Sequence, residues 1–389
     1  MKVFVLGNSS DAFVELCGIA MIERTLRVLQ RLGVAEVSIV DANAAVGAAL
    51  SKPSWARAEL KLDFVNNLLS SDELTLVIPG GSYCDLRLLT GLLKRTKPTL
   101  LIDSNPPNEW LPLLAKAERL PAGFVCGPEI RGGAEELLDV AALDPYSDLL
   151  RRVLHPLWFP PPAQERIAQA ERLILDSTQK GILDVTARLH WPFENFIVRR
   201  LWRTRITPNQ VTWSSTLFGC LGTIAFARGA WWWGFVIARI FAILDGVDGK
   251  LARVKVETTK VGKGEHYSDA ALEYSWWLTL AYSLGAANQL QHGWIYAAFI
   301  IAGDLLGKLA NALVAAHTGR PSHRGSEFER YFRLIGGRRD IYTAMLLIGL
   351  LVRQPGHAFA FAGWWSLISL AIQAVRTVYV CFGTPRLAR

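Results

Sequence analysis

The C-terminal half of this 389-residue chain consists largely of apolar stretches separated by basic loops. Most of these stretches approach the roughly 20 residues that an α-helix needs to cross the hydrocarbon core of a bilayer. Hydrophobic residues make up 51% of the chain, which is high for a soluble protein. We therefore expect an α-helical membrane region with about six spans. They would occupy residues 209–227, 231–249, 267–287, 293–316, 340–353 and 358–382.

Basic residues are concentrated on alternate loops between these stretches. Lysines and arginines are frequent in residues 250–263 and 320–339, whereas the opposite loops contain only Arg228 and Arg353. Because basic loops remain in the cytosol, the pattern requires an even number of spans. It predicts an integral membrane protein, in the inner membrane if bacterial, with both termini and the active site in the cytosol. A soluble protein with buried helices would leave this alternation unexplained.

The first 150 residues show a different pattern, in which apolar strands alternate with helical segments. This pattern predicts a soluble α/β domain with a mainly parallel sheet over residues 1–150. The Pro-rich residues 156–162 mark a boundary, and residues 151–208 are expected to form a linker and an amphipathic juxtamembrane helix. The membrane domain would then cover residues 209–385. The four predicted strands are residues 3–6, 36–40, 74–78 and 99–102.

The net charge of +8 raises the question of a nucleic-acid partner. The basic residues flank apolar stretches, which favours loops beside membrane lipids, and we expect no nucleic acid. The five cysteines are scattered and form no Cys-x-x-Cys pair. This spacing indicates neither a disulfide framework nor a zinc site.

Several carboxylates gather around the cytosolic end of the second stretch. Asp245 and Asp248 lie three residues apart and so share one helix face. Glu265, Asp269 and Glu273 follow at four-residue intervals. Acidic residues at membrane spans are costly and usually functional, and oxygen ligands suit Mg²⁺ or Mn²⁺. Spacing alone, however, is equally compatible with solvated helix ends that carry ordinary acid–base pairs.

Two motifs connect this cluster with a known family. Residues 245–253, Asp-Gly-Val-Asp-Gly-Lys-Leu-Ala-Arg, resemble the D-x-x-D-G-x-x-A-R opening of the CDP-alcohol phosphotransferase signature. Gly262 has the spacing of the next glycine in that signature, and residues 207–212, Thr-Pro-Asn-Gln-Val-Thr, resemble the T-P-N-x-x-T before the first membrane helix. Residues 336–340 also resemble a loop in the branch that makes phosphodiester-linked inositol phosphates. The resemblance covers about residues 181–385.

The sequence departs from the family where two further aspartates are expected. His266 and Ala270 occupy those positions. A one-residue deletion would make Glu265 the third acid and Asp269 the fourth. A second alignment uses Asp269 as the third acid and Glu273 as the fourth. The first is preferred because it retains the signature glycine and a terminal aspartate.

The resemblance implies a metal-dependent transfer of a phospho-alcohol or phosphatidyl group, in phospholipid or related phosphodiester synthesis. Asp245 and Asp248 would hold two Mg²⁺ or Mn²⁺ ions and the CDP-alcohol donor, and Glu265 would complete the site. Asp269, also a metal ligand, would take the proton from the acceptor hydroxyl that attacks the β-phosphorus, and CMP would leave. The nucleotide would be bound by Asp245, Asp248, Gly249, Ala252, Arg253 and Gly262.

The acceptor, a lipid or a phospho-alcohol, is not identified by the sequence. Basic residues beside the membrane are candidates for an anionic acceptor, although each also fits simple anchoring to the membrane surface. These candidates are Arg199, Arg200, Arg203, Arg338 and Arg339. The resemblance also implies a homodimer.

The N-terminal domain has its own resemblance, to sugar nucleotidyltransferases, over residues 15–40 and 76–83. The Gly-rich phosphate loop of such enzymes is replaced by residues 7–13, and the metal-binding aspartate is replaced by Ser82, with Asp85 nearby. We therefore expect a degenerate domain with a structural or regulatory role. The alternative is a bifunctional cytidylyltransferase and phosphotransferase that makes its own donor.

Two further hypotheses come from other functional classes. A transporter or receptor would carry acidic residues near the middle of several spans, whereas this cluster lies at one end of two. A catalytically inactive membrane scaffold would explain the departure at the third acid.

Overall fold

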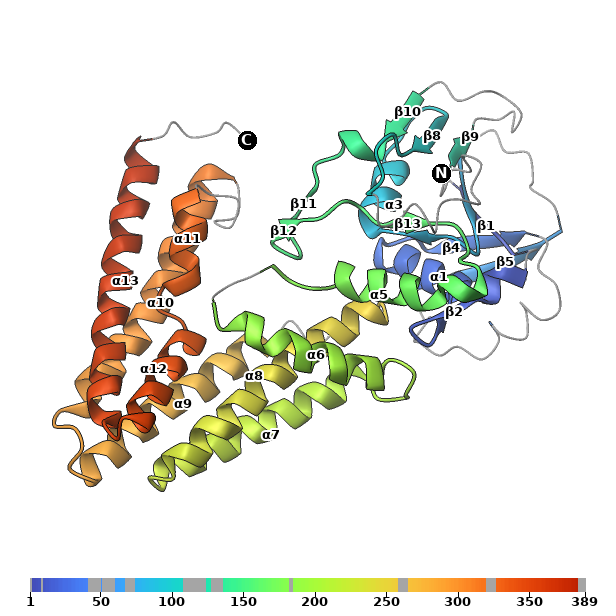
Figure 1. The fold of residues 1–389 in the computed structure, drawn as a ribbon. Coiled ribbons are helices and arrows are strands. Elements are labelled where there is room, and N and C mark those ends of the chain that lie inside the picture. The colour runs from blue at the N-terminus through green and yellow to red at the C-terminus, as the bar shows by residue number, and fades with distance from the viewer. Residues whose placement is uncertain are drawn as a thin grey trace.

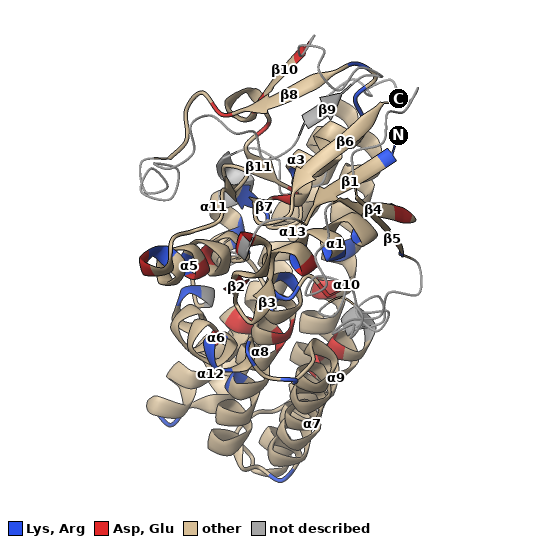
Figure 2. Cartoon of the chain, turned by 90° about the vertical axis from the view of Figure 1, so that its right-hand side faces the viewer, with Lys and Arg blue, Asp and Glu red and all other residues tan. Residues whose placement is uncertain are grey.

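The chain folds into an α/β region followed by a helical region (Figure 1). The computed structural model describes residues 2–7, 10–40, 50, 60–66, 74–107, 124–126, 136–181, 185–257, 265–319 and 327–383. Charged residues gather where the two regions meet, while the far end of the helical region has few of them (Figure 2).

The α/β region is built on a seven-stranded sheet with the order β10-β8-β9-β6-β1-β4-β5. Among the described strands of this sheet, only β9 runs antiparallel to its neighbours, so the predicted mainly parallel sheet is confirmed. Continuous apolar runs form its centre, as expected for strands covered on both faces. The strands are β1 Lys2–Leu6, β4 Glu36–Val40, β5 Lys61–Val65, β6 Thr75–Pro79, β8 Thr99–Ile102, β9 Phe124–Cys126 and β10 Glu136–Asp139.

Helices and small strand pairs complete this region. Helix α1 (Met21–Arg31) buries Ile22 and Leu26 against the sheet, and α3 (Leu86–Leu93) buries Leu88 and Leu89. Helix α5 (Ile167–Ser177) follows the sheet in sequence. The strand pairs are β2 Glu15–Leu16 with β3 Ile19–Ala20, β7 Tyr83–Cys84 with β13 Trp158–Phe159, and β11 Tyr146–Ser147 with β12 Arg152–Val153.

In the helical region, each of the six predicted apolar stretches coincides with a helix. A shorter helix, α11, lies in the basic loop before the fifth stretch and was not predicted. Aromatic side chains fill the core, where Trp276 packs edge-on against Phe241 and Trp277 against Tyr342. The helices are α6 Ala187–Leu201, α7 Pro208–Ala227, α8 Trp231–Val254, α9 Glu265–Ala286, α10 Gly293–Thr318, α11 Glu327–Ile335, α12 Arg339–Leu351 and α13 Pro355–Gly383.

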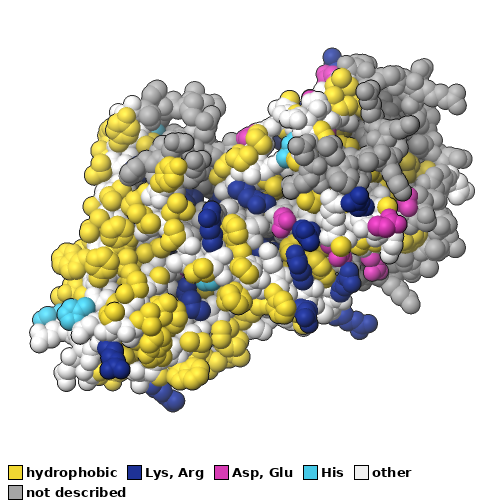
Figure 3. Space-filling model, in the orientation of Figure 1, with side chains coloured by type: hydrophobic (Ala, Val, Ile, Leu, Met, Phe, Trp, Pro, Cys, Tyr) yellow, Lys and Arg dark blue, Asp and Glu magenta, His cyan; other side chains and the backbone are white. Residues whose placement is uncertain are grey.

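The outer surface of the helical region is apolar. Within the described residues, α10 and α13 are long and apolar enough to cross a membrane. Large hydrophobic side chains also stand exposed on the other helices, and they dominate this part of the surface in Figure 3. On α6, Leu189, Phe193 and Phe196 are exposed at positions i, i+4 and i+7, which makes one apolar face. This agrees with the predicted amphipathic helix.

The two regions are joined at the C-terminal end of α8. The Nη1 atoms of Arg24 and Arg27, both on α1, donate to the carbonyls of Val254 and Lys255 at 2.6 Å. The last carbonyls of a helix have no partner within the helix and carry partial negative charge. Helix α1 therefore caps the helix that carries Asp245 and Asp248.

Candidate active site

Helix α8 runs without a break through the sequence from Asp245 to Arg253. Two glycines in this stretch lie against side chains that leave little or no room for a Cβ atom. A Cβ at Gly246 would lie 2.4 Å from Glu194 Oε1, and one at Gly249 would lie 3.2 Å from Arg253 Nη1. The glycines thus let α6 approach α8 closely and let the Arg253 guanidinium lie over Gly249.

Asp248 is almost fully buried, and a threonine fixes its carboxylate. Thr212 Oγ1 donates to Asp248 Oδ2 at 2.7 Å. Thr212 is held in place because Thr207 begins α7 with a capping box, in which its hydroxyl and the Gln210 side chain each bind a backbone N–H. The two sequence motifs, residues 207–212 and 245–253, are therefore in direct contact. No role was predicted for Thr212, although the motif that contains it was recognised.

Asp245 contacts a residue from the start of α12. Arg339 Nη2 lies 3.2 Å from Asp245 Oδ2, and the guanidinium lies over the ring of Phe241 at 5.1 Å. The same guanidinium interacts electrostatically with Asp340 and Glu273. Arg339, predicted as an acceptor-binding residue, thus lies within the acidic cluster. Arg338 immediately precedes α12 and is half-buried.

Helix α9 carries the remaining acids, and Glu273 interacts electrostatically with Arg339. Asp269 and Glu273 are half-buried and one turn apart, and Glu273 accepts a hydrogen bond from Trp277 Nε1 at 3.4 Å. Glu265 is the first residue of α9, and its side chain lies outside the described residues, as does Gly262. The structure therefore leaves both alignments of the third and fourth acids open.

A buried lysine ties the end of α8 to two other segments. Lys250 is 1% exposed, and its Nζ lies 3.0 Å from Glu194 Oε2 and 2.7 Å from Asn195 Oδ1, both on α6. It also donates to Gln179, just after α5. Burial lowers the pKa of Lys250, and Glu194 acts against this shift. The sequence assigned no role to Lys250 or Glu194, which are too far apart along the chain for spacing to pair them.

Arg253 reaches the end of α5. Its Nε donates to the Thr178 carbonyl at 2.8 Å, and burial lowers its pKa to about 10. Ala252, its neighbour, is half-buried. Arg253 thus stabilises the junction between α8 and the end of α5 in addition to lying over Gly249.

Three of the predicted acceptor arginines lie near the end of α6. In the described part of the chain, their contacts do not involve the acids of α8 or α9. Arg199 and Arg200 are exposed, and the Arg200 guanidinium lies 5.0 Å from the ring centre of Phe196. Arg203 binds Glu171 of α5 at 3.0 Å, and this hydrogen bond raises the pKa of Arg203. Arg203 therefore already has an acidic partner in the linker.

At the C-terminal edge of the sheet, two glycines pack closely against neighbouring segments. A Cβ atom at Gly80 would lie 2.3 Å from the Leu6 carbonyl oxygen, and one at Gly81 would lie 2.8 Å from Pro161. Ser82 is buried. Asp85 caps α3 and forms an ion pair with Arg87 at 3.1 Å, so its carboxylate is already engaged.

The chemistry of the acidic cluster fits a hard divalent cation. Asp245, Asp248 and Asp269 offer carboxylate oxygens from two neighbouring helices, and Mg²⁺ and Mn²⁺ prefer such ligands. Within the described part of the chain, no three His, Cys, Asp or Glu side chains form a ready cation site. Asp245, Asp248 and Asp269 are the described residues that would hold such an ion.

Comparison with known proteins agrees with the motifs. Residues 205–378 match the family model described as CDP-alcohol phosphatidyltransferase. A bifunctional IPC transferase and DIPP synthase from Rubrobacter xylanophilus is 34% identical over 163 residues, which cover 41% of this chain and 34% of that protein. The protein of the same name from Aquifex aeolicus is 24% identical over 276 residues, covering 66% and 58%. The chain thus spans about a third to somewhat over half of these relatives.

Further similarities fall on shorter proteins. A phosphatidylinositol phosphate synthase from Corynebacterium glutamicum is 24% identical over 204 residues, covering 50% of this chain and 85% of the relative. The crystal structure of the Mycobacterium tuberculosis phosphatidylinositol phosphate synthase with manganese and citrate aligns with 19% identity and a TM-score of 0.38, covering 51% and 93%. The family model and the two motifs within its range show that residues 205–378 of this chain belong to the CDP-alcohol phosphatidyltransferase family.

Proposed function

We propose that this protein is a membrane-embedded CDP-alcohol phosphotransferase. It transfers a substituted phosphate group from a CDP-alcohol to an acceptor hydroxyl and releases CMP. The observation that carries the proposal is the 2.7 Å hydrogen bond from Thr212 to Asp248, which joins the two motifs of the matched region. A chance resemblance in two separate segments would not require those segments to meet at a buried carboxylate.

Asp245 and Asp248 are the proposed ligands of two Mg²⁺ or Mn²⁺ ions. In the preferred alignment, Glu265 and Asp269 complete the ligand set. When bound, the ions supply positive charge that stabilises the attacking and leaving oxygens at phosphorus. Gly249, Ala252, Arg253 and Gly262 are the proposed nucleotide contacts.

The chain's own residues position these acids. Thr212 holds one Asp248 oxygen and so orients the carboxylate. Arg339 balances the charge of Asp245 in the absence of cations and fixes the start of α12 against α8. Such supporting contacts typically change metal affinity or activity 10- to 100-fold when removed.

Asp269 is the proposed general base, because both alignments retain it as an acid of the site. In the first alignment it accepts the proton of the acceptor hydroxyl, and Glu265 is the third ligand. In the second, Asp269 is the third ligand and Glu273 is the base. Glu273 interacts with Arg339, which already contacts Asp245, and this supports keeping the second alternative.

The proposed topology places α7, α8, α9, α10, α12 and α13 across the membrane. Helix α6 would lie at the cytosolic surface through its apolar face, with both termini and the acidic cluster on that side. The exposed apolar side chains of these helices support this arrangement. The proposed boundaries are 1–150 for the α/β domain, 151–208 for the linker and 209–385 for the membrane domain, and the family's homodimer is proposed for this chain.

The relatives suggest which acceptor to test first. One is named a phosphatidylinositol phosphate synthase, so a phosphorylated polyol is the first class, followed by a lipid alcohol. For the α/β domain we propose a structural role, because Ser82 is buried and Asp85 is used as a helix cap. A bifunctional enzyme is the second candidate, since two relatives carry that word in their names.

The test is product formation by the full-length protein in lipid. Labelled CDP-alcohols and acceptors are supplied with Mg²⁺ or Mn²⁺, and CMP and the phosphodiester product are quantified together. Asp269→Asn and Glu273→Gln are compared with Asp176→Asn, which removes an exposed carboxylate on α5.

Equal amounts of CMP and product, lost in Asp269→Asn and retained in Asp176→Asn, are expected. Loss of chemistry in Glu273→Gln with substrate binding intact would select the second alignment. Absence of product with every pair, from folded protein, would favour the inactive scaffold.

A further inference from the structure

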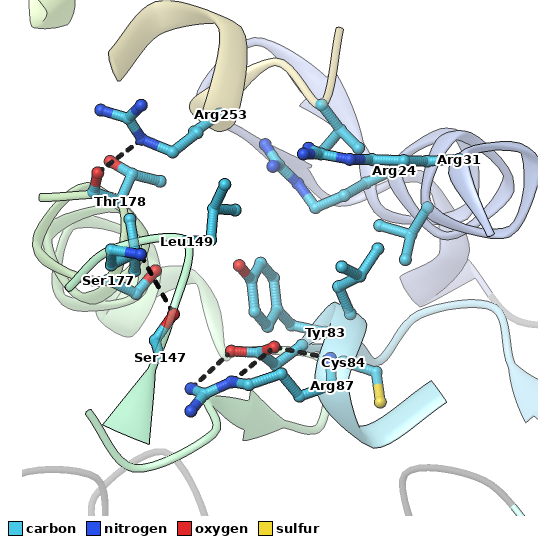
Figure 4. Close-up of a pocket in the computed structure, with 15 residues that line it drawn as sticks. Arg24, Arg31, Tyr83, Cys84, Arg87, Ser147, Leu149, Ser177, Thr178 and Arg253 are labelled. Carbon is cyan, nitrogen blue, oxygen red and sulfur yellow. Dashed lines mark hydrogen bonds and ion pairs between the residues drawn. The ribbon is translucent and has the colours of Figure 1, made fainter. Parts of the chain in front are cut away.

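A cavity of about 130 Å³ lies where the α/β region meets the C-terminal end of α8 (Figure 4). Its walls come from α1, the turn between β7 and α3, the β11–β12 segment, and the ends of α5 and α8. Asp245 and Asp248 do not line it. Arg253, a proposed nucleotide contact, and Asp85 do line the cavity, so it borders both sites considered above but is distinct from the acidic cluster.

The lining is strongly basic. It includes four arginines, Arg24, Arg31, Arg87 and Arg253, and a single carboxylate, Asp85. Asp85 is already bound to Arg87, with Asp85 Oδ2 3.1 Å from Arg87 Nη2. The other three arginines therefore have no counter-charge within the lining.

Two of these arginines have unused hydrogen-bonding capacity. Arg31 forms no hydrogen bond or ion pair within the described residues, and its side chain is exposed. Arg24 is 3% exposed; its Nη atoms bind the Leu16 and Val254 carbonyls, but its buried Nε has no partner within the described residues. A buried donor without an acceptor is costly. Figure 4 shows both side chains extending from α1 into the cavity, and the Arg24 guanidinium lies 5.9 Å from the centre of the Tyr83 ring.

The remaining lining limits what could bind. Hydroxyl groups of Tyr83, Ser147 and Thr178 are interleaved with apolar side chains, among them Leu149 and Leu150. The volume suits an anionic group with a small attached part, not a polymer. Guanidinium groups match the oxygens of phosphate in geometry and charge, better than they match a single halide ion.

We propose that this cavity binds the phosphate or pyrophosphate group of a small soluble molecule, held by Arg24 and Arg31. Because its walls belong to both regions, a bound anion holds α1 against the end of α8. Arg253 lines the cavity and also lies over Gly249, so the occupied cavity adjoins the helix that carries the acidic cluster.

The test is direct binding to the full-length protein in detergent, with EDTA present so that no cation recruits anions to the acidic cluster. Inorganic phosphate and pyrophosphate are titrated by calorimetry and by thermal unfolding, with sodium chloride at matched ionic strength as the comparison. The variant is Arg31→Gln, which removes an exposed side chain and should fold normally. The matched control is Arg172→Gln, an exposed arginine on α5 that does not line the cavity.

Saturable binding by the wild type and by Arg172→Gln, weakened at least about tenfold in Arg31→Gln, is the expected result, since one lost charge-assisted contact is worth about that factor. Arg31→Lys should recover part of the affinity because it restores the charge. Equal binding by Arg31→Gln and the wild type would overturn the proposal. So would a chloride effect equal to that of phosphate, or no binding by folded wild-type protein.

Discussion

Substitution of Arg24 by methionine tests whether α1 caps the helix that carries the acidic cluster. Arg24 is buried and donates to the Val254 carbonyl at 2.6 Å and to the Leu16 carbonyl at 2.9 Å. Methionine has a similar length but no donor, so both carbonyls would lose this partner. The apolar packing of the side chain would remain largely intact.

The expected cost follows from these two bonds. A hydrogen bond from a charged donor contributes roughly 1.5–3 kcal/mol net. Two such bonds give about 3–6 kcal/mol, and relief from burying a charge offsets part of this, so we expect a loss of about 2–4 kcal/mol. For a cooperative unit of 150–250 residues, 1 kcal/mol shifts Tm by about 2–4 °C, so Arg24→Met should lower Tm by roughly 4–16 °C.

The assay is thermal unfolding of the purified full-length protein in phosphate-free buffer, followed by tryptophan fluorescence and circular dichroism. Arg31→Met is the matched control, because Arg31 lies on the same helix and forms no hydrogen bond within the described residues. The capping interpretation would be refuted if Arg24→Met and Arg31→Met unfolded within about 1 °C of each other.

Three further predictions concern other parts of the chain. Thr212→Val removes the hydrogen bond to Asp248 and should raise the Mn²⁺ concentration for half-maximal CMP release about tenfold. Thr212→Ser keeps the hydroxyl and should stay near the wild type. Equal metal dependence of the wild type and both variants would contradict the positioning role of Thr212. Arg339→Met should lower the free energy of unfolding by about 2 kcal/mol. This is less than for a fully buried ion pair, because Asp245 is partly exposed. An equal effect of the exposed control Arg353→Met in thermal unfolding would contradict the prediction. Burial raises the pKa of the Cys17 thiol to about 12 and also raises that of Cys84, so both stay protonated at pH 8. Mass spectrometry should therefore find both cysteines unmodified by iodoacetamide while the protein is folded. Unfolding should expose them to labelling, because free thiols have a pKa of about 8.5. Rapid labelling of the folded protein would argue against the burial of these two thiols.

Much of the secondary structure could be predicted because it depends on local patterns. The runs at residues 3–6 and 36–40 are apolar enough to be sheet strands, and they are the adjacent strands β1 and β4. The six apolar stretches each became a helix. Helix α11 was missed because its charged residues, among them Arg333, made the segment look like part of a basic loop.

The contacts that organise the candidate site could not be predicted, since they join residues far apart in the chain. Periodicity shows which face of a helix is apolar, but not which helix will pack against it. Thr212 and Asp248 are 36 residues apart, and Arg24 and Val254 are 230 apart. Arg339 was expected to receive an acceptor, and its position beside Asp245 depends on how α12 packs against α8.

After Gly262 the sequence departs from the family signature. Glu265 and Asp269 can be aligned in two ways, and the Glu265 side chain lies outside the described residues. Only chemistry can separate the two alignments, which is why substitutions at Asp269 and Glu273 are paired in the product assay.

The most direct test of the proposed transferase is metal-dependent CMP release by the full-length protein in lipid, measured for the wild type, Asp245→Ala, Asp248→Ala and the control Asp176→Asn. Release should require Mg²⁺ or Mn²⁺, remain near the wild-type rate in Asp176→Asn, and fall at least about 100-fold in both alanine variants, as expected when a metal ligand is lost. Release that persisted in EDTA, or that survived in Asp248→Ala, would contradict a metal-dependent site built on these two aspartates.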